Sequence, residues 1–188
     1  MKVLAFNGSP REKGNTHLMI RHLFNTLQRH GIETEEINVG KELIYACKGC
    51  WKCRTLKRCV IEDDQLNGWV AAMRGVDGIV LASPTYYANV TSNMKAMIDR
   101  AGNVAGADGF LAHKVGAPIV VNRRSGAIQV YNALLAFFGI RNMIVPMSTY
   151  WNNGLGREIG EVENDEEGLR TMTNLGETMA WLLKKLAS

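Results

Sequence analysis

The chain has 188 residues, of which 46% are hydrophobic and 21% are charged, and its formal net charge at pH 7 is +4. This composition is close to the average for globular proteins and excludes a disordered or fibrous chain, while the length favours one domain over residues 1–188. The small basic excess suits a small anionic ligand and is too thin to indicate binding to nucleic acid.

Short apolar runs and helical spacings alternate along the chain. Strands are predicted where an apolar run ends in residues that favour turns, at 3–6, 35–39, 77–82, 117–121 and 142–146. Helices are predicted where apolar residues recur every three or four positions, from 15 up to the stop at Gly31 and at 65–74, 91–101, 126–138 and 165–186. Residues 41–63 form a cysteine-rich loop between the second strand and the second helix.

This alternation predicts an α/β fold, with a parallel sheet covered by helices on both faces. Because crossovers between parallel strands are right-handed, few strand orders remain, and five short strands favour the flavodoxin-like order 2-1-3-4-5. We therefore expect a flavodoxin-like three-layer sandwich with a five-stranded parallel sheet and the strand 35–39 near an edge. The acidic stretch 158–167 is interpreted as a solvated loop and is given no function.

Hydropathy and cysteine content bear on the compartment. No apolar run approaches the roughly 20 residues that span a bilayer, so we expect no association with a membrane. The first eight residues turn polar too early for the core of a signal peptide. The four cysteines are then expected to be thiols, metal ligands or redox groups of a cytoplasmic protein rather than structural disulfides.

Residues 8–16 join the first strand to the first helix, where a doubly wound sheet binds phosphate. The N–H groups of the helix start would hold an anion, with hydrogen bonds from Ser9, Asn15 and Thr16 and the charge of Arg11. The spacing excludes a Walker A motif, because Asn15 stands where that motif needs lysine, and the segment is not G-x-G-x-x-G. A helix start capped by Asn15 or Thr16, without a ligand, stays open as the plainer alternative.

At these positions the chain resembles a known family. Gly8-Ser9-Pro10-Arg11 followed by Gly14-Asn15-Thr16 resembles the phosphate loop of the NADPH-dependent FMN reductases and iron–sulfur flavoproteins. The resemblance continues through Ser83-Pro84-Thr85-Tyr86-Tyr87, Lys95 and Asp99-Arg100, and it covers residues 1–146. It implies that the chain binds FMN, and that the first loop holds the FMN phosphate through Ser9, Arg11, Gly14, Asn15 and Thr16.

The loop after the third strand is expected to form a wall for the flavin ring. It lies at the carboxyl edge of the sheet beside the first loop. Backbone N–H groups and aromatic contacts are available there from Pro84, Thr85, Tyr86 and Tyr87. The alternative is a pair of tyrosines that pack on a loop and keep their hydroxyls in water.

The loop after the fourth strand contains two arginines. The resemblance implies that the pyrimidine edge of the flavin is bordered by Asn122, Arg123, Ser125 and Gly126. This sequence departs from the family there, because Arg123 and Arg124 stand where the loop is usually richer in glycine. An arginine near flavin N1 would stabilise the anionic reduced ring. The alternative is two solvated arginines at a helix start.

The four cysteines follow the pattern C-x2-C-x2-C-x5-C, formed by Cys47, Cys50, Cys53 and Cys59. The first three have the spacing of a bacterial ferredoxin. With its longer last gap, the motif resembles the compact motif of iron–sulfur flavoproteins and implies a [4Fe–4S] cluster near FMN. A zinc site usually takes two C-x2-C pairs a longer stretch apart, so zinc matches this spacing less well. A segment kept as structure without a cluster also stays open.

These features together predict an FMN-dependent oxidoreductase. Its donor would be NAD(P)H or ferredoxin and its acceptor a small molecule. Because the flavin carries the chemistry, no side chain is named as catalytic. Two alternatives are a flavodoxin-like electron carrier and a non-catalytic flavin-binding protein with a structural zinc loop.

A homodimer or homotetramer is also expected. Several aromatic residues lie on loops, namely Trp51, Tyr87, Tyr150 and Trp151. Such residues are enriched in interface cores. A single small domain would also leave one face of the flavin open.

Overall fold

The structure, a computed structural model, describes residues 1–187. Within them, one five-stranded parallel sheet has the order β2-β1-β3-β4-β5, which confirms the predicted flavodoxin-like α/β fold. Its strands are β1 (Lys2–Asn7), β2 (Glu33–Asn38), β3 (Gly78–Pro84), β4 (Val115–Asn122) and β5 (Asn153–Leu155).

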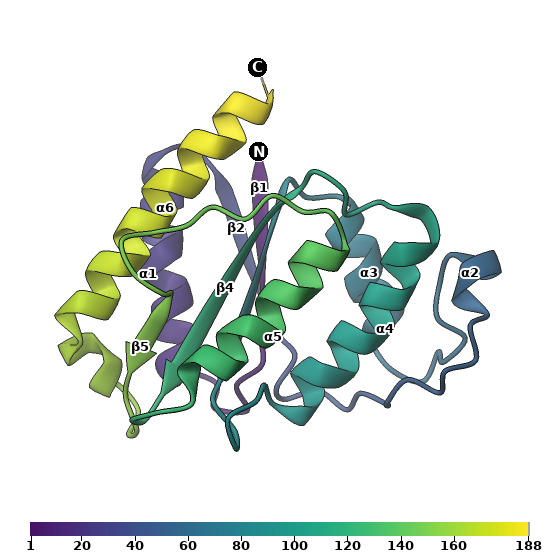
Figure 1. Ribbon diagram of the computed structural model, residues 1–188, viewed down its shortest axis with the longest axis horizontal. Coiled ribbons are helices and arrows are strands. Elements are labelled where there is room, and N and C mark those ends of the chain that lie inside the picture. The colour runs from purple at the N-terminus through teal and green to yellow at the C-terminus, as the bar shows by residue number, and fades with distance from the viewer. Residues whose placement is uncertain (188) are drawn as a thin grey trace.

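Helices cover both faces of the sheet (Figure 1). One face packs against α1 (Asn15–Arg29) and α6 (Glu166–Ala187), and the other against α3 (Leu66–Arg74), α4 (Ser92–Asp108) and α5 (Ala127–Ile140). Two short helices stand apart, α2 (Cys53–Leu56) beside α4 and the 3-10 helix η1 (Glu161–Asn164) before α6. Within the described chain, no helix combines the length and the apolarity that crossing a membrane requires.

Two apolar cores lie on opposite faces of the sheet because successive side chains of a strand point to opposite faces. In β1, Val3 and Ala5 pack with α1 and α6, whereas Leu4 and Phe6 pack with α3 and α4. Every residue of β4 is buried. The central strands are therefore continuous apolar runs, as expected for a parallel sheet covered on both sides.

Helix α4 is longer than the predicted range 91–101 and ends at Gly109, which has a φ of 73°. Two glycines lie inside the helix without ending it. A Cβ on Gly102 would make an ordinary contact with the Phe137 ring at 3.4 Å, and a Cβ on Gly106 would lie 2.0 Å from the Arg141 guanidinium. The helix continues past both of them to Gly109.

The prediction of a fifth strand at 142–146 was wrong. Only Ile144 pairs there, through one bridge to Val115, and the strand β5 lies ten residues further on. On the edge of β4 that faces the fifth strand, the N–H groups of Gly116 and Val120 each donate a hydrogen bond at 2.9 Å. Pro118 lies between these two residues and has no N–H to donate. The missing donor interrupts pairing, so the chain leaves the sheet and returns only at Asn152, whose side-chain amide donates to the Pro118 carbonyl at 3.0 Å.

Candidate functional site

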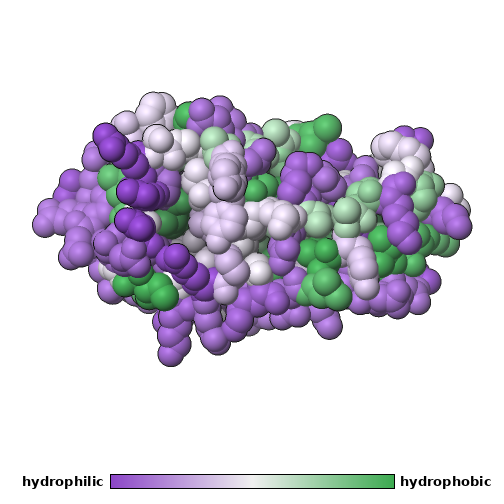
Figure 2. Space-filling view, turned by 90° about the horizontal axis from the view of Figure 1, so that it is seen from below, coloured by the Kyte–Doolittle hydropathy of each residue, from purple (hydrophilic) through white to green (hydrophobic). Residues whose placement is uncertain are grey.

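The loops after β1, β3 and β4 come together at the carboxyl edge of the sheet (Figure 1), and residues of all three loops line a pocket there. Most of the predicted cofactor residues line it: Ser9, Arg11, Asn15, Thr16, Pro84, Thr85, Tyr86, Asn122 and Arg123. Figure 2 looks onto this edge and shows residues of intermediate hydropathy across its middle, flanked by strongly hydrophilic side chains. Parallel strands end at one edge, which is why segments far apart in sequence meet in this edge pocket.

The first loop presents a helix start to the edge pocket. Helix α1 begins after Gly14, and no side chain caps its first turn. The first N–H groups of a helix have no intrahelical acceptor, so they and the positive end of the helix dipole are available to an anion. In the structure, neither Asn15 nor Thr16 caps the helix. Gly14 itself does not line the pocket.

Asn15 connects the first loop to the segment after β5. Its amide Nδ2 donates to the Glu158 carbonyl, and its Oδ1 accepts from the Gly160 N–H, both at 2.8 Å. Arg11 makes a parallel contact, with Nη1 donating to the Arg157 carbonyl at 2.8 Å. The acidic segment, to which the sequence assigns no function, is thus bonded to the first loop.

Three lining residues of the edge pocket were missed by the sequence interpretation, namely Val121, Gly156 and Arg157. Gly156 could have been predicted as a site residue from its position one residue after a strand. A Cβ there would lie 2.6 Å from the Asn15 amide nitrogen, so the close approach of the two loops requires glycine. Because the fifth strand was predicted too early, this position was not assigned to the carboxyl edge of the sheet.

The loop after β3 forms a tight two-residue turn. Tyr86 and Asn89 exchange backbone hydrogen bonds at 2.9 and 3.0 Å, and the central Tyr87 and Ala88 have φ values of 49° and 57°. Such positive values at residues other than glycine are uncommon and concentrate at functional sites. The turn places Tyr87 at the tip, fully exposed and outside the edge pocket, whereas Tyr86 lines it.

The loop after β4 separates the edge pocket from a second, adjoining pocket. Arg123 lines the edge pocket, and Arg124 lines the adjoining one. Two other predicted residues, Ser125 and Gly126, also line the adjoining pocket together with Tyr150 and Trp151. The structure thus places Arg123 in one cavity and Ser125 and Gly126 in the other, and Asn122 lines both.

The edge pocket contains buried polar atoms that lack a partner. Of the side-chain polar atoms buried within residues 1–187, three have no hydrogen-bond partner, and two of these are Thr85 Oγ1 and Asn122 Oδ1. Both residues line the edge pocket. Buried polar groups without a partner are rare because each costs about 1–3 kcal/mol. Their convergence on one pocket indicates a polar ligand that would satisfy them.

All four cysteines line one further pocket, on the outer side of α4. Cys47 and Cys50 are exposed, Cys59 is half-buried and Cys53 is buried at the start of α2. Burial raises the pKa of the Cys53 thiol, and the three neighbouring cysteines raise it further. Over residues 1–187, no three Cys, His, Asp or Glu side chains form a group that could hold a single metal ion. A four-iron cluster sets a different requirement, because each of its thiolates binds a separate iron atom.

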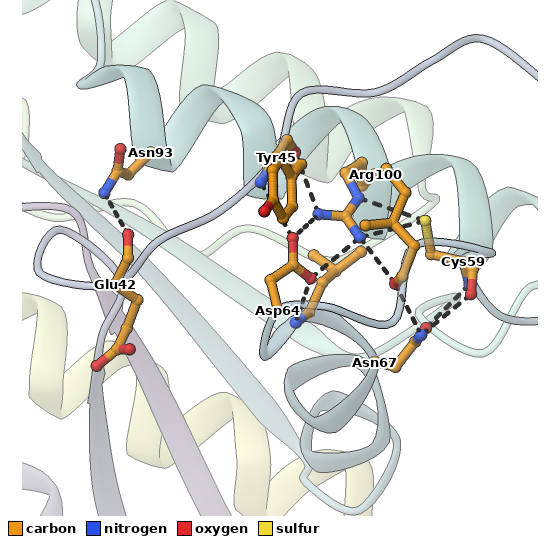
Figure 3. Close-up of polar contacts among 9 residues, drawn as sticks. Glu42, Tyr45, Cys59, Asp64, Asn67, Asn93 and Arg100 are labelled. Carbon is orange, nitrogen blue, oxygen red and sulfur yellow. Dashed lines mark hydrogen bonds and ion pairs between the residues drawn. The ribbon is translucent and has the colours of Figure 1, made fainter.

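Cys59 is fixed by the helices behind it (Figure 3). Asn67 of α3 accepts from the Cys59 N–H at 2.9 Å and donates to its carbonyl at 3.0 Å. Asp64 pairs with Arg100 of α4 in a buried ion pair. Burial opposes ionisation of Asp64, but hydrogen bonds from Arg100 and from the N–H groups of Tyr45 and Leu66 outweigh it, so the Asp64 pKa lies below its ordinary value.

Comparison with known proteins agrees with this geometry. The strand order and the edge pocket define a flavodoxin-like α/β protein, and the fold is shared with RosB at a TM-score of 0.76 and with an archaeal flavodoxin at 0.65. RosB is 20% identical over 100% of this chain and 80% of its own, and the flavodoxin is 15% identical over 98% and 99%.

The chain belongs to the NADPH-dependent FMN reductase and iron–sulfur flavoprotein family, and the sequence profile of NADPH-dependent FMN reductase matches residues 1–157. It is 36% identical to an iron–sulfur flavoprotein of Methanocaldococcus jannaschii over 98% of both chains. An iron–sulfur flavoprotein of Methanosarcina thermophila is 28% identical over 98% of this chain and 96% of its own. The family predicted from the residues is thereby confirmed.

Proposed function

We propose that this protein is an FMN-dependent oxidoreductase that takes electrons from NAD(P)H or ferredoxin and passes them to a small-molecule acceptor. The observation that carries the proposal is the edge pocket, which combines an uncapped helix start with two unpartnered buried polar atoms. Family membership supports the flavin as the ligand of this pocket. When bound, FMN supplies hydride and one-electron transfer.

Different residues of the edge pocket would bind different parts of FMN. The N–H groups at the start of α1, the hydroxyls of Ser9 and Thr16 and the charge of Arg11 would bind the phosphate. Thr85 Oγ1 and Asn122 Oδ1 would hydrogen-bond the rest of the cofactor. Asn15 also lines the pocket, and its side chain bonds Glu158 and Gly160 and so supports the segment after β5.

Thr85→Val should stabilise the flavin-free protein and weaken FMN binding. Valine keeps the shape of threonine and removes a buried hydroxyl whose lack of a partner costs about 1–3 kcal/mol. In the wild type, a hydrogen bond to FMN would relieve this cost on binding, so Thr85→Val should weaken binding by the same amount, about 1–3 kcal/mol, and raise the Kd roughly five- to 150-fold. Urea unfolding of the flavin-free proteins and fluorescence titration with FMN measure the two effects.

Thr26→Val provides the matched control. Thr26 is also buried, but its hydroxyl accepts a hydrogen bond from Arg29 at 3.1 Å and lies outside the edge pocket. This variant should lose stability and bind FMN as the wild type does. If Thr85→Val behaves in the same way as Thr26→Val, the Thr85 hydroxyl does not contact the flavin.

We further propose that the four cysteines hold a [4Fe–4S] cluster. Their common pocket, the compact spacing and the iron–sulfur flavoprotein relatives support it. The pocket also offers N–H donors to sulfur, since the Asn103 amide lies 3.7 Å from Cys47 Sγ. Such donors stabilise the negative charge of thiolate ligands.

The function is tested by anaerobic purification, identification of the released flavin, and turnover assays with NADPH, NADH and reduced ferredoxin. Steady-state transfer from one of these donors to a quinone or another small acceptor is expected. A protein that carries FMN and is reduced once but never turns over would be an electron carrier instead. Release of FAD, or failure to take up FMN, would overturn the proposal.

We also propose that the protein is a homodimer or homotetramer. The edge pocket and the cysteine pocket share no lining residue, and Figure 1 shows α2 beyond α4, on the side away from α5. Several loop aromatics are exposed, namely Trp51, Tyr87, Tyr150 and Trp151. A two-fold contact would bury them and bring the cysteine pocket of one subunit near the flavin of another. Light scattering at micromolar concentration should give at least twice the chain mass of 20.8 kDa, and a fully active monomer would contradict the proposal.

A further inference from the structure

Arg100 is the largest side chain that the fold buries completely within residues 1–187, with 2% of its surface exposed. It lies on α4, behind the cysteine pocket and away from the edge pocket. Burying a charged group is costly unless the charge is paired and its hydrogen-bonding groups are satisfied. Its partners therefore indicate what the fold gains from placing a guanidinium there.

Each partner of Arg100 lies in the segment that carries the cysteines or directly after it (Figure 3). Its Nη1 donates to the Tyr45 carbonyl at 3.1 Å, and its Nη2 donates to the Ile61 carbonyl at 3.3 Å. The carboxylate of Asp64, whose side chain is 0% exposed, neutralises the charge. The remaining contacts go to sulfur, since Nε and Nη2 both donate to Cys59 Sγ at 3.3 Å.

We propose that Arg100 is a positioning residue of the four-cysteine site, which fixes Cys59 Sγ through two N–H···S hydrogen bonds and thereby raises the reduction potential of the bound cluster. The part that concerns the potential rests on the proposed [4Fe–4S] cluster. The part that concerns the position of Cys59 rests on the contacts of Arg100 alone.

The direction of the effect follows from charge. One-electron reduction adds negative charge to an iron–sulfur cluster and its thiolates, and no bond to a ligand has to form or break. Hydrogen bonds donated to the ligand sulfurs stabilise the reduced form more than the oxidised form, and so raise the potential. Two donors aimed at one sulfur require the planar fork of arginine, since a lysine ammonium is a single point charge.

A purely structural role for Arg100 is the competing explanation, because the ion pair alone would hold α4 against the cysteine segment. Arg100→Lys separates the two roles: it keeps a positive charge for Asp64 and removes the fork that reaches Cys59. The double variant Asp64→Asn with Arg100→Gln removes both charges together and leaves no unpaired buried ion. Arg74→Gln is the matched control, since Arg74 also bonds a carboxylate, that of Asp108, and a carbonyl of the cysteine segment, that of Lys57, but no sulfur.

The experiment uses the full chain, purified without oxygen and reconstituted with iron and sulfide. Iron content and the reduction potential, followed by visible and electron paramagnetic resonance spectra, are measured for each variant. Arg100→Lys and the double variant should have a lower potential than the wild type, and Arg74→Gln should match the wild type. An iron-loaded Arg100→Lys protein with the wild-type potential would overturn the effect on the cluster.

A second measurement does not need a cluster. In the iron-free protein at about pH 10, above the ordinary pKa of cysteine, the alkylation rate reports access to the sulfur, and iodoacetamide should modify Cys59 several-fold faster in Arg100→Lys than in the wild type, with exposed Cys47 as the internal reference. Equal rates at Cys59 would overturn the positioning role. If the wild type takes up no iron, the cluster proposal fails by itself, and the alkylation rates still decide what Arg100 does.

Discussion

Replacing Cys59 by serine should remove the iron from the anaerobically isolated protein and leave its FMN bound. The cysteines come from one segment, and the pocket that they line shares no residue with the edge pocket. Serine is a poor ligand for iron in place of a thiolate, so the whole cluster, and not a quarter of it, is expected to be lost. Iron, sulfide and flavin analyses on the same sample measure the result.

Lys52→Ser is the control for this substitution, because Lys52 lies between two of the cysteines and does not line their pocket. It should retain iron and flavin in full. Two results would contradict the prediction: wild-type protein that contains stoichiometric zinc and no iron, or a Cys59→Ser protein with unchanged iron. The first would favour the structural zinc loop over the cluster.

Asp64→Asn should lower the free energy of unfolding by about 3–5 kcal/mol, the usual cost of removing one partner of a buried ion pair. The side chains of Asp64 and Arg100 are 0% and 1% exposed, so the guanidinium left behind has no water to solvate it. Asp108→Asn is the control, since its pair with Arg74 has side chains that are 25% and 36% exposed. Partly exposed pairs contribute about 0–1 kcal/mol. Urea unfolding compares the two, and equal small losses would contradict the prediction.

The same pair should make stability depend on pH. The pKa of Asp64 is lowered in the folded protein, so the unfolded chain binds the proton at a higher pH than the native state does. The contribution of the pair is complete above about pH 4, the ordinary aspartate pKa, and is lost as the pH falls through the lower folded value. The difference in stability between wild type and Asp64→Asn should therefore shrink in acid. A difference that stays constant down to pH 3 would show that the charge is not involved.

Much of the fold and of the edge pocket could be predicted because both depend on local patterns and one topological rule. Buried parallel strands are apolar runs, and their carboxyl ends meet at one edge. The sequence alone therefore predicts that the segments after β1, β3 and β4 form one site. The side chains of Thr16 and Thr85 do line the same pocket.

The features that could not be predicted depend on contacts between distant residues. Arg100 and Asp64 are 36 positions apart, and no local pattern marks the pair. Asn15 was assigned to a phosphate by its position in the loop, and only the folded chain shows its amide bonded to residues more than 140 positions away. Tyr87 was counted as a wall of the pocket, but the tight turn places its side chain in solvent.

Pairing between β4 and the fifth strand is interrupted at Pro118 of β4. The stability of the sheet therefore depends little on the length of the segment that runs beside β4 there. That segment is held at Ile144, which bonds Lys114, and at Asn152, which bonds Pro118. Lengthening a chain between two fixed ends costs conformational entropy that grows only with the logarithm of its length, about 0.6 kcal/mol for each doubling. Insertions between Ile144 and Asn152 should therefore cost the sheet little stability, and the length of this segment can change without loss of the fold.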